Sequence, residues 1–353
     1  MHRREFLHPR SLARSAGHVA GLLGELRFPD DAAEPEEVVL LRFSRRAMAT
    51  TFEVILPFGT PDARPLAEAA LDLIDRLEDQ LTVYRVESEV SRLNRTAPHA
   101  AVPVEEGLFR LLTRAAQLTA ETHGAFDVAV GALIKAWGFF RGPKRVPTKE
   151  ERAAALARSG MAHVVLDPAA RSVRYLREGL EINLGSIGKG YALDCVAELL
   201  RRDIGLSTAL LHGGTSSVCA LGSEPGSPHG WTVGLPHPWE PDRRLGMVRL
   251  KDQALGTSAA TFQHLEWQGR KLGHILDPRT GWPAEGVASV SVVAPTAAEA
   301  DALATAFYIL GPDPARAYCE LHPGVGAVML PAGEGARPLV FGLAPEQAIL
   351  FDS

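Results

Sequence analysis

The nine residues 273–281, GHILDPRTG, hold three side chains that can act on a phosphate within one short segment. The imidazole of His274, the carboxylate of Asp277 and the guanidinium of Arg279 stand around a proline and a glycine. Because proline and glycine favour turns, this segment predicts a turn that holds titratable groups at the end of a strand.

A second segment, residues 299–305, follows about one strand later and places Asp301 and Thr305 four residues apart. On a helix that spacing puts a carboxylate and a hydroxyl on the same face. Oxygen ligands of this kind beside a His/Asp/Arg turn suit a phosphorylated ligand that is bound with a hard cation.

Residues 182–191, INLGSIGKGY, predict a strand that passes into a helix through three glycines. Such a junction lets a ligand approach the backbone, and the helix N-terminus offers unpaired amides to an anion. The spacing fits neither a Rossmann fingerprint nor a P-loop, so close packing explains the glycines equally well.

Composition limits the classes of protein that the chain can belong to. Its 353 residues include 46% hydrophobic residues, enough for a sizeable core, and carry a net charge of −5. That charge gives no reason to expect nucleic acid as a partner, since such binding needs a basic field. Three scattered cysteines are too few for a disulfide framework or a zinc site.

Residues 1–40 are expected to form a basic leader with an acidic linker. Arg3 and Arg4, followed by Glu-Phe-Leu, resemble a twin-arginine export signal, but the hydrophobic part that should follow is poor. The localisation therefore stays open: the bacterial cell envelope or periplasm if the leader acts as an export signal, and the cytoplasm otherwise. No stretch approaches the ~20 apolar residues of a membrane span.

Residues 41–353 are expected to form one compact unit with an α+β fold, in which mixed short-stranded sheets pack against helices. Hydrophobic periodicity predicts helices at 62–82, at 105–122, after the glycine junction, and after a capping box formed by Thr296 and Glu299. The charged segment 144–160 is expected to be helical and to form a surface insertion. Strands are predicted at 51–57, 162–167, 172–176, 208–212, 217–221, 230–235, 246–251, 263–268 and 288–293.

Taken one at a time, the polar residues have ordinary explanations. An Asx turn alone would explain Asp277 before Pro278, Asp301 can sit on a solvated helix face, and a lone histidine is more often structural than catalytic. Arg279 can steady a phosphate or pin its own loop, and the loop role is slightly favoured.

Taken together, the segments resemble the ApbE-like family of flavin transferases, the FAD:protein FMN transferases. The resemblance runs from about residue 47 to 312, and its most specific segments are HILDPRTG and the AD-x3-T pattern. The segments that carry it are MATTFEV, YRVESEVSRLN, GAFDVAVGALIKAWGF, INLGSIGKGYALD, HGG, LGTS, HILDPRTGWP and EADALATAFYILG.

The resemblance implies a T-fold-like architecture and an enzyme that binds FAD with Mg²⁺. Such enzymes transfer the FMN half of FAD onto a Ser or Thr hydroxyl of a target flavoprotein and release AMP. The chemistry is consistent with the residue types, because phosphoryl transfer asks a protein mainly to position reactants and to neutralise phosphate charge.

The resemblance also implies roles for particular residues. Ser186, Asp301 and Thr305 match the magnesium site, and His274 with Asp277 matches the segment at the reacting phosphate, His274 being the natural general base. The positions that match the lining of the FAD pocket are Met48, Tyr84, Ala125, Phe126, Asp127, Asn183, Lys189 and Leu276.

Four positions depart from the pattern of many relatives. These have Gly where Ala49 stands, Asp where Asn183 stands, Asp where Thr215 stands, and a Ser-Gly-Asp type of run at residues 258–260, which read Ser-Ala-Ala. Asn183 still forms hydrogen bonds but carries no charge. The altered run puts the shape of the acceptor or flavin pocket in question.

Two other functions fit the same residues. A metal-dependent FAD pyrophosphatase would use water in place of the acceptor hydroxyl and release FMN and AMP. A non-catalytic FAD-binding protein would tolerate the lost acidic residues.

Overall fold

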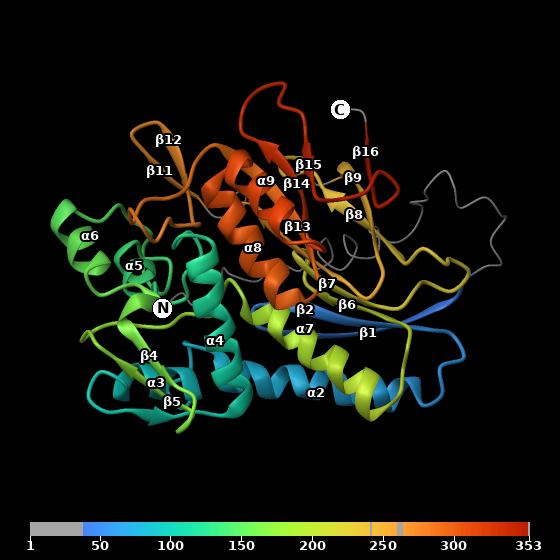
Figure 1. Ribbon diagram of the computed structural model, residues 1–353, viewed down its shortest axis with the longest axis horizontal. Helices are drawn as coiled ribbons and strands as arrows, with labels where there is room; N and C mark the ends of the chain where they lie inside the picture. The colour runs from blue at the N-terminus through green and yellow to red at the C-terminus, as the bar shows by residue number, and fades with distance from the viewer. Residues whose placement is uncertain (1–37, 241, 260–263, 352–353) are drawn as a thin grey trace, which may run out of the picture.

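A large antiparallel sheet forms the centre of the protein in the computed structural model, which describes residues 38–240, 242–259 and 264–351 (Figure 1). The side chain of His264 is not described. Residues 1–37 of the predicted leader and Ala260 lie outside these ranges. Along the sheet the strands are, in order, β1 (Leu40–Ala47), β2 (Thr50–Pro57), β6 (Ala209–Gly213), β7 (Ser217–Leu221), β10 (Ala254–Ala259), β13 (Val287–Ala294), β14 (Gly326–Pro331) and β15 (Leu339–Phe341).

Helices cover one face of this sheet. They are α2 (Ala63–Leu81), α7 (Gly188–Glu198, continued by a π-helical turn at Leu199–Asp203), α8 (Ala297–Leu310) and α9 (Pro312–Leu321). Figure 1 shows α7 and α8 side by side over the strands, and both contact β7. Side chains alternate across a strand, so Phe52 and Val54 of β2 enter this core while Ile55 faces the other way.

A small sheet covers the opposite face. It consists of β8 (Trp231–Pro236), β9 (Arg244–Leu250) and β16 (Ala348–Leu350). Trp231 and Val248 are fully buried in the second core, which also takes Ile55 and Val293 of the large sheet. The large sheet is therefore buried on both faces, which explains why its strands lack a clean apolar/polar alternation.

The remaining elements form the end of the molecule that carries the predicted turn. They are α3 (Glu89–Thr96), β3 (Val102–Pro103), α4 (Glu106–Glu121), α5 (Gly131–Ala136), α6 (Lys149–Leu156), a 3-10 turn (Met161–His163), β4 (Val164–Asp167), β5 (Ser172–Tyr175), β11 (His264–Trp267) and β12 (Arg270–Gly273). A third apolar cluster joins α5 and α6 to β12 and the turn through Leu133, Ala155, Leu272 and Leu276.

The α+β fold predicted from the sequence is confirmed, and most predicted elements occur within a few residues of their expected bounds. Segment 144–160 is a correction: its helix covers only Lys149–Leu156, begins at a Thr148/Glu151 capping box, and buries Ala155 completely. Thr296 caps α8 as predicted, but the Glu299 carboxylate binds Arg114 at 2.8 Å. None of the helices within the described ranges is long and apolar enough to cross a membrane.

Candidate active site

Two helices, α7 and α8, meet so closely that their contact admits only a glycine. A Cβ on Gly190 would lie 2.1 Å from the carbonyl oxygen of Ala297. Four residues further along α7, the Asp194 carboxylate accepts hydrogen bonds from the amides of Ala297 and Ala298 at 2.7 and 2.8 Å. Burial raises the pKa of Asp194 to about 7, against the effect of these two amides. The first turn of α8 is therefore anchored to α7.

The same contact delivers Asp301 of α8 to the N-terminus of α7. Asp301 is only 6% exposed, and its carboxylate accepts from the Gly190 amide (2.9 Å) and the Ser217 hydroxyl (2.7 Å to Oδ1, 3.0 Å to Oδ2). The Lys189 ammonium lies 4.0 Å from Oδ2. Burial raises the pKa of Asp301, and Lys189, Ser217 and Gly190 oppose that rise. Asp301 is thus not on a solvated helix face, as the ordinary interpretation had it.

Thr305 lies one helical turn after Asp301. Its hydroxyl donates to the Asp301 backbone carbonyl at 3.2 Å and lies 3.4 Å from the hydroxyl oxygen of Ser258. One carboxylate with neutral oxygens fits Mg²⁺, which keeps several waters and shares its coordination with substrate phosphates. Among the described residues no three His, Cys, Asp or Glu side chains gather in a way that could hold a metal ion.

The predicted DPRTG turn is present, and within it Arg279 is bonded to Asp277. The guanidinium binds both oxygens of Asp277 at 2.9 Å, and the Arg279 amide donates to Asp277 Oδ1 at 2.9 Å. The Asp277 side chain raises the pKa of Arg279. These contacts agree with the loop-pinning role and with the Asx turn, both expected from the sequence.

Neighbouring elements hold this turn in place. The indole N–H of Trp137, at the end of α5, donates to the Gly281 carbonyl at 2.9 Å, and the Arg152 guanidinium lies over the Trp282 ring. A Cβ on Gly124 would lie 3.6 Å from Arg279 Cγ. The half-buried His274 precedes the turn, directly after β12.

The contacts therefore join the candidate residues in two groups. Asp301, Lys189 and Thr305 are joined by α7 and α8, whereas Asp277 and Arg279 are joined to α5 and Gly124. Within the described residues, the hydrogen bonds of the Asp277 carboxylate go to Arg279 and do not reach the Asp301 group.

Two segments predicted at the FAD pocket lie side by side. The backbone amide of Asn183 donates to the Val128 carbonyl at 2.8 Å. The side-chain oxygen of Asn183, Oδ1, accepts from the backbone amide of Gly185 at 2.9 Å. The Asp127 carboxylate accepts from two backbone amides, at 2.7 and 2.8 Å, and burial raises its pKa. Ala125 and Phe126 are fully buried in the core. A ligand here would meet backbone more than the side chains of residues 125–127.

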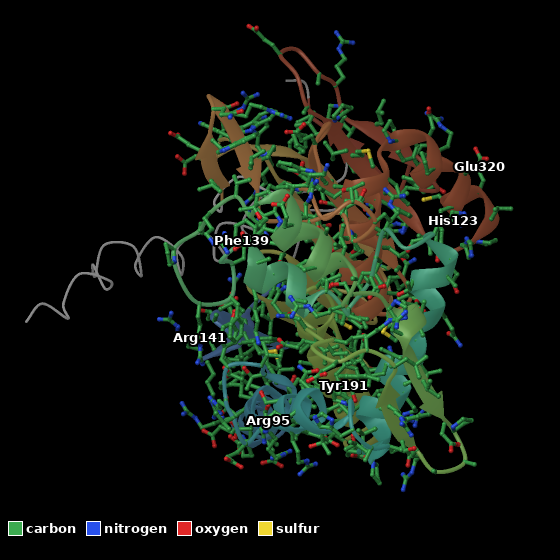
Figure 2. All side chains as sticks on the ribbon, turned by 90° about the vertical axis from the view of Figure 1, so that its left-hand side faces the viewer. Arg95, His123, Phe139, Arg141, Tyr191 and Glu320 are labelled. Atoms are coloured by element: carbon green, nitrogen blue, oxygen red, sulfur yellow. The ribbon has the colours of Figure 1, made fainter. Side chains whose placement is uncertain are left out.

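Three further predicted pocket residues occupy different surroundings. Met48 is half-buried in the β1–β2 turn, and Leu276 packs in the third apolar cluster. Tyr84 is 53% exposed, and its ring stacks on Phe140 with 4.8 Å between centroids. Arg141, at the margin of the face in Figure 2, donates to the Tyr84 carbonyl at 2.6 Å.

Two polar residues, Ser217 and Asn94, connect the matched segments and were not predicted from the sequence. Ser217 holds Asp301, and Asn94 binds the Ile182 peptide through both its carbonyl oxygen (2.8 Å) and its amide group (2.9 Å). Asn94 ends the YRVESEVSRLN segment, which was a signal that could have been used. Ser217 lies three residues after a double glycine, and nothing in its spacing marks it.

The residues that depart from the family pattern lie in different surroundings. Met48 and Ala49 form a two-residue turn with φ of +47° and +61°, a conformation that favours glycine. Thr215 is exposed at the end of β6, whereas the Ser258 hydroxyl adjoins Thr305.

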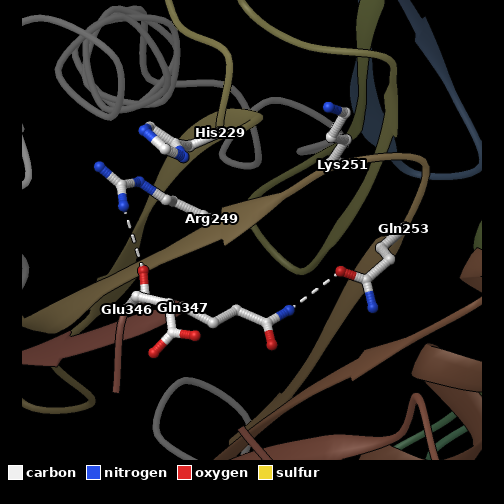
Figure 3. Close-up of a pocket in the computed structure, with 6 residues that line it drawn as sticks. All are labelled: His229, Arg249, Lys251, Gln253, Glu346 and Gln347. Carbon is white, nitrogen blue, oxygen red and sulfur yellow. Dashed lines mark hydrogen bonds between the residues drawn. The ribbon is translucent and has the colours of Figure 1, made fainter. Parts of the chain in front are cut away.

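A cavity of about 140 Å³ lies away from these groups, beside the small sheet (Figure 3). Arg249 donates to the Glu346 carbonyl at 3.2 Å, and Gln347 donates to the Gln253 side chain at 2.9 Å. None of the predicted site residues lines it; its lining residues are His229, Arg249, Lys251, Gln253, Glu346 and Gln347.

Fold and site together define a class: an α+β protein whose buried aspartate, neighbouring threonine and glycine-rich helix N-terminus suit a phosphate-bearing ligand with a hard cation. The ApbE family profile matches residues 48–329, and the chain belongs to the ApbE family.

Relatives and solved structures agree with this assignment. The FAD:protein FMN transferase of Klebsiella pneumoniae is 31% identical over 300 residues, which cover 81% of this chain and 83% of that protein. The crystal structure of the ApbE protein of Thermotoga maritima has a TM-score of 0.78 and 29% identity, covering 86% of this chain and 97% of that one. The flavin transferase ApbE of Vibrio cholerae has a TM-score of 0.76 and 26% identity, with the same coverage.

Proposed function

We propose that the protein is an FAD:protein FMN transferase, which moves the FMN moiety of FAD onto a Ser or Thr hydroxyl of a target flavoprotein and releases AMP. The observation that carries the proposal is the Asp301–Thr305 pair, held against the N-terminus of α7 in a chain that belongs to the ApbE family.

Asp301, the Thr305 hydroxyl and the backbone of Ser186 would hold Mg²⁺, which neutralises charge on the phosphates of FAD when it is bound. Lys189 of α7 adds a positive charge beside Asp301. The positive end of the α7 dipole also favours a phosphate oxygen here, while the Gly188 and Gly190 amides already donate to the Leu184 carbonyl and to Asp301.

His274 is the proposed base. As the acceptor oxygen forms its bond to the FMN phosphorus, the hydroxyl proton passes to the imidazole, and the bond from that phosphorus to the bridging oxygen of AMP breaks. The bonds between the Asp277 carboxylate and Arg279 hold the shape of the turn. Asp277 would thereby fix the position of His274, which precedes the turn.

The experiment combines the protein, FAD, Mg²⁺ and an acceptor flavoprotein domain with a suitable Thr. We expect a phosphoester-linked FMN on the acceptor by mass spectrometry and one AMP per FMN transferred. Asp301→Asn and His274→Gln should abolish or strongly reduce transfer, whereas Arg145→Gln, which changes a surface pair with Glu151, should leave it intact.

Two results would reject the proposal. Release of FMN and AMP at equal rates with or without acceptor would identify a pyrophosphatase. FAD binding without any turnover, unaffected by His274→Gln, would identify a binding protein.

A further inference from the structure

Ser217 of β7 is a buried hydroxyl that contacts the predicted metal ligand from a distant part of the chain. The residue has no exposed surface, and its hydroxyl lies 2.7 Å from Asp301 Oδ1 and 3.0 Å from Oδ2. The two residues are separated by 84 positions in the sequence. Ser217 therefore meets Asp301 only because α8 packs across β7.

The donors around Asp301 are unevenly divided between its two oxygens. Oδ2 accepts from the Gly190 amide and lies 4.0 Å from the Lys189 ammonium, whereas the shorter Ser217 contact is to Oδ1. A carboxylate oxygen has about two acceptor positions, so after Ser217 donates to it, Oδ1 still has one for a cation. The arrangement fixes the carboxylate plane without using up its capacity to bind a metal.

We propose that Ser217 is a positioning residue for the metal: its hydroxyl orients the Asp301 carboxylate toward the cation that the FAD phosphates share. This inference rests on the proposed function, because it takes Asp301 as a magnesium ligand. Hydrogen bonds from outside the coordination sphere hold a ligand in its binding orientation, and losing one lowers metal affinity by about 10- to 100-fold.

A purely structural role makes a different prediction. If Ser217 only satisfies a buried carboxylate, its loss would lower stability and leave metal affinity unchanged. Ser291 of β13 provides a matched control: it is also buried on the large sheet, and its hydroxyl bonds the Thr257 hydroxyl at 2.8 Å and not the Asp301 carboxylate.

The experiment measures Mn²⁺ binding by electron paramagnetic resonance and Mg²⁺ binding by calorimetry, on the full chain with and without saturating FAD. We expect Ser217→Ala to weaken metal binding by about 10- to 100-fold. Ser291→Ala should change it less than about twofold, although both variants lose a buried hydroxyl. Thermal unfolding without metal gives the structural cost of each substitution separately.

Ser217→Cys keeps the side chain small and replaces the hydroxyl by a weaker donor, so it covers the case in which Ser217→Ala does not fold. It should weaken metal binding in the same direction. Metal affinity equal to or tighter than that of the parent, in a folded Ser217 variant, overturns the inference. Absence of metal binding in the parent itself would instead reject the magnesium part of the proposed function.

Discussion

The core contains a buried histidine that must stay neutral when the protein is folded. Unfolding at low pH is therefore the most direct test of how the core is packed. His212 of β6 is 1% exposed, and within the described residues neither ring nitrogen has a hydrogen-bond partner. It stands opposite Glu53 of β2 and next to Val218, on the face that packs against the small sheet. Burial, assisted by the charge of Arg42, lowers the pKa of His212 from 6.5 to about 4.

The sign of the effect follows from proton binding. Between pH 6.5 and pH 4 the unfolded chain binds a proton at His212 that the folded chain does not, so stability is lost as the pH falls through this window. With the two pKa values above, the linkage relation gives a loss of about 2–3 kcal/mol between pH 7.5 and pH 4.5.

The assay is urea unfolding of the parent and of His212→Leu at both pH values, with the slope of the transition checked in each case. The variant should not lose the part of the free energy of unfolding that protonation of His212 removes between pH 7.5 and pH 4.5. It should also gain about 1–3 kcal/mol at pH 7.5, because the unsatisfied imidazole is removed, while Glu53 Oε2 stays as it is in the parent.

His229→Gln, a change at an exposed histidine, controls for the loss of an imidazole. Carboxylates remote from residue 212 cancel in the comparison, and Glu53→Gln in both proteins removes the titration of Glu53, which stands opposite His212. If parent and His212→Leu lose the same stability between the two pH values, the reasoning about His212 is refuted.

Three other predictions follow from the structure. Ala49→Gly should raise the free energy of unfolding by about 0.5–1 kcal/mol, because Ala49 has a positive φ; an unchanged urea midpoint would contradict this. Arg279→Ala should lower kcat/KM for FMN transfer about tenfold or more, since the bidentate bond to Asp277 shapes the turn beside His274; activity equal to that of Arg145→Ala would count against it. Asp194 has a folded pKa of about 7 against 3.8 in the unfolded chain, so it costs stability as the pH rises from about 4 to 7, by up to about 4 kcal/mol. Unfolding of Asp194→Asn across this range should lack that decline, and a parallel decline in parent and variant would disprove the assignment.

Local patterns predicted the parts of the site that depend on neighbours in the chain. The spacing of Asp301 and Thr305 placed them on one helix face, and the Pro and Gly of residues 273–281 predicted the turn, because helical periodicity and turn geometry are set within a few residues. Thr296 was likewise found as the cap of α8.

Longer-range partners could not be obtained in this way. Asn94 meets Ile182 across 88 residues, and Asp194 meets Ala297 across 103. The bonds of Arg279 to Asp277 and the approach of Gly124 likewise come from the packed structure. Such contacts depend on which elements pack together, and one sequence contains no record of that.

Strand β10 shows the physical limit most clearly. Apart from Leu255, its residues Ala254–Ala259 are small and include Gly256, a composition that disfavours a strand prediction. A Cβ on Gly256 would lie 2.3 Å from the carbonyl carbon of Ala300, so the glycine is required by the approach of α8. The sequence by itself determined that a carboxylate and a hydroxyl share one face of a helix. Only the tertiary structure decided which hydroxyl, amide and ammonium surround that carboxylate, because α7, β7 and α8 reach it from distant positions in the chain and meet only when the core is packed.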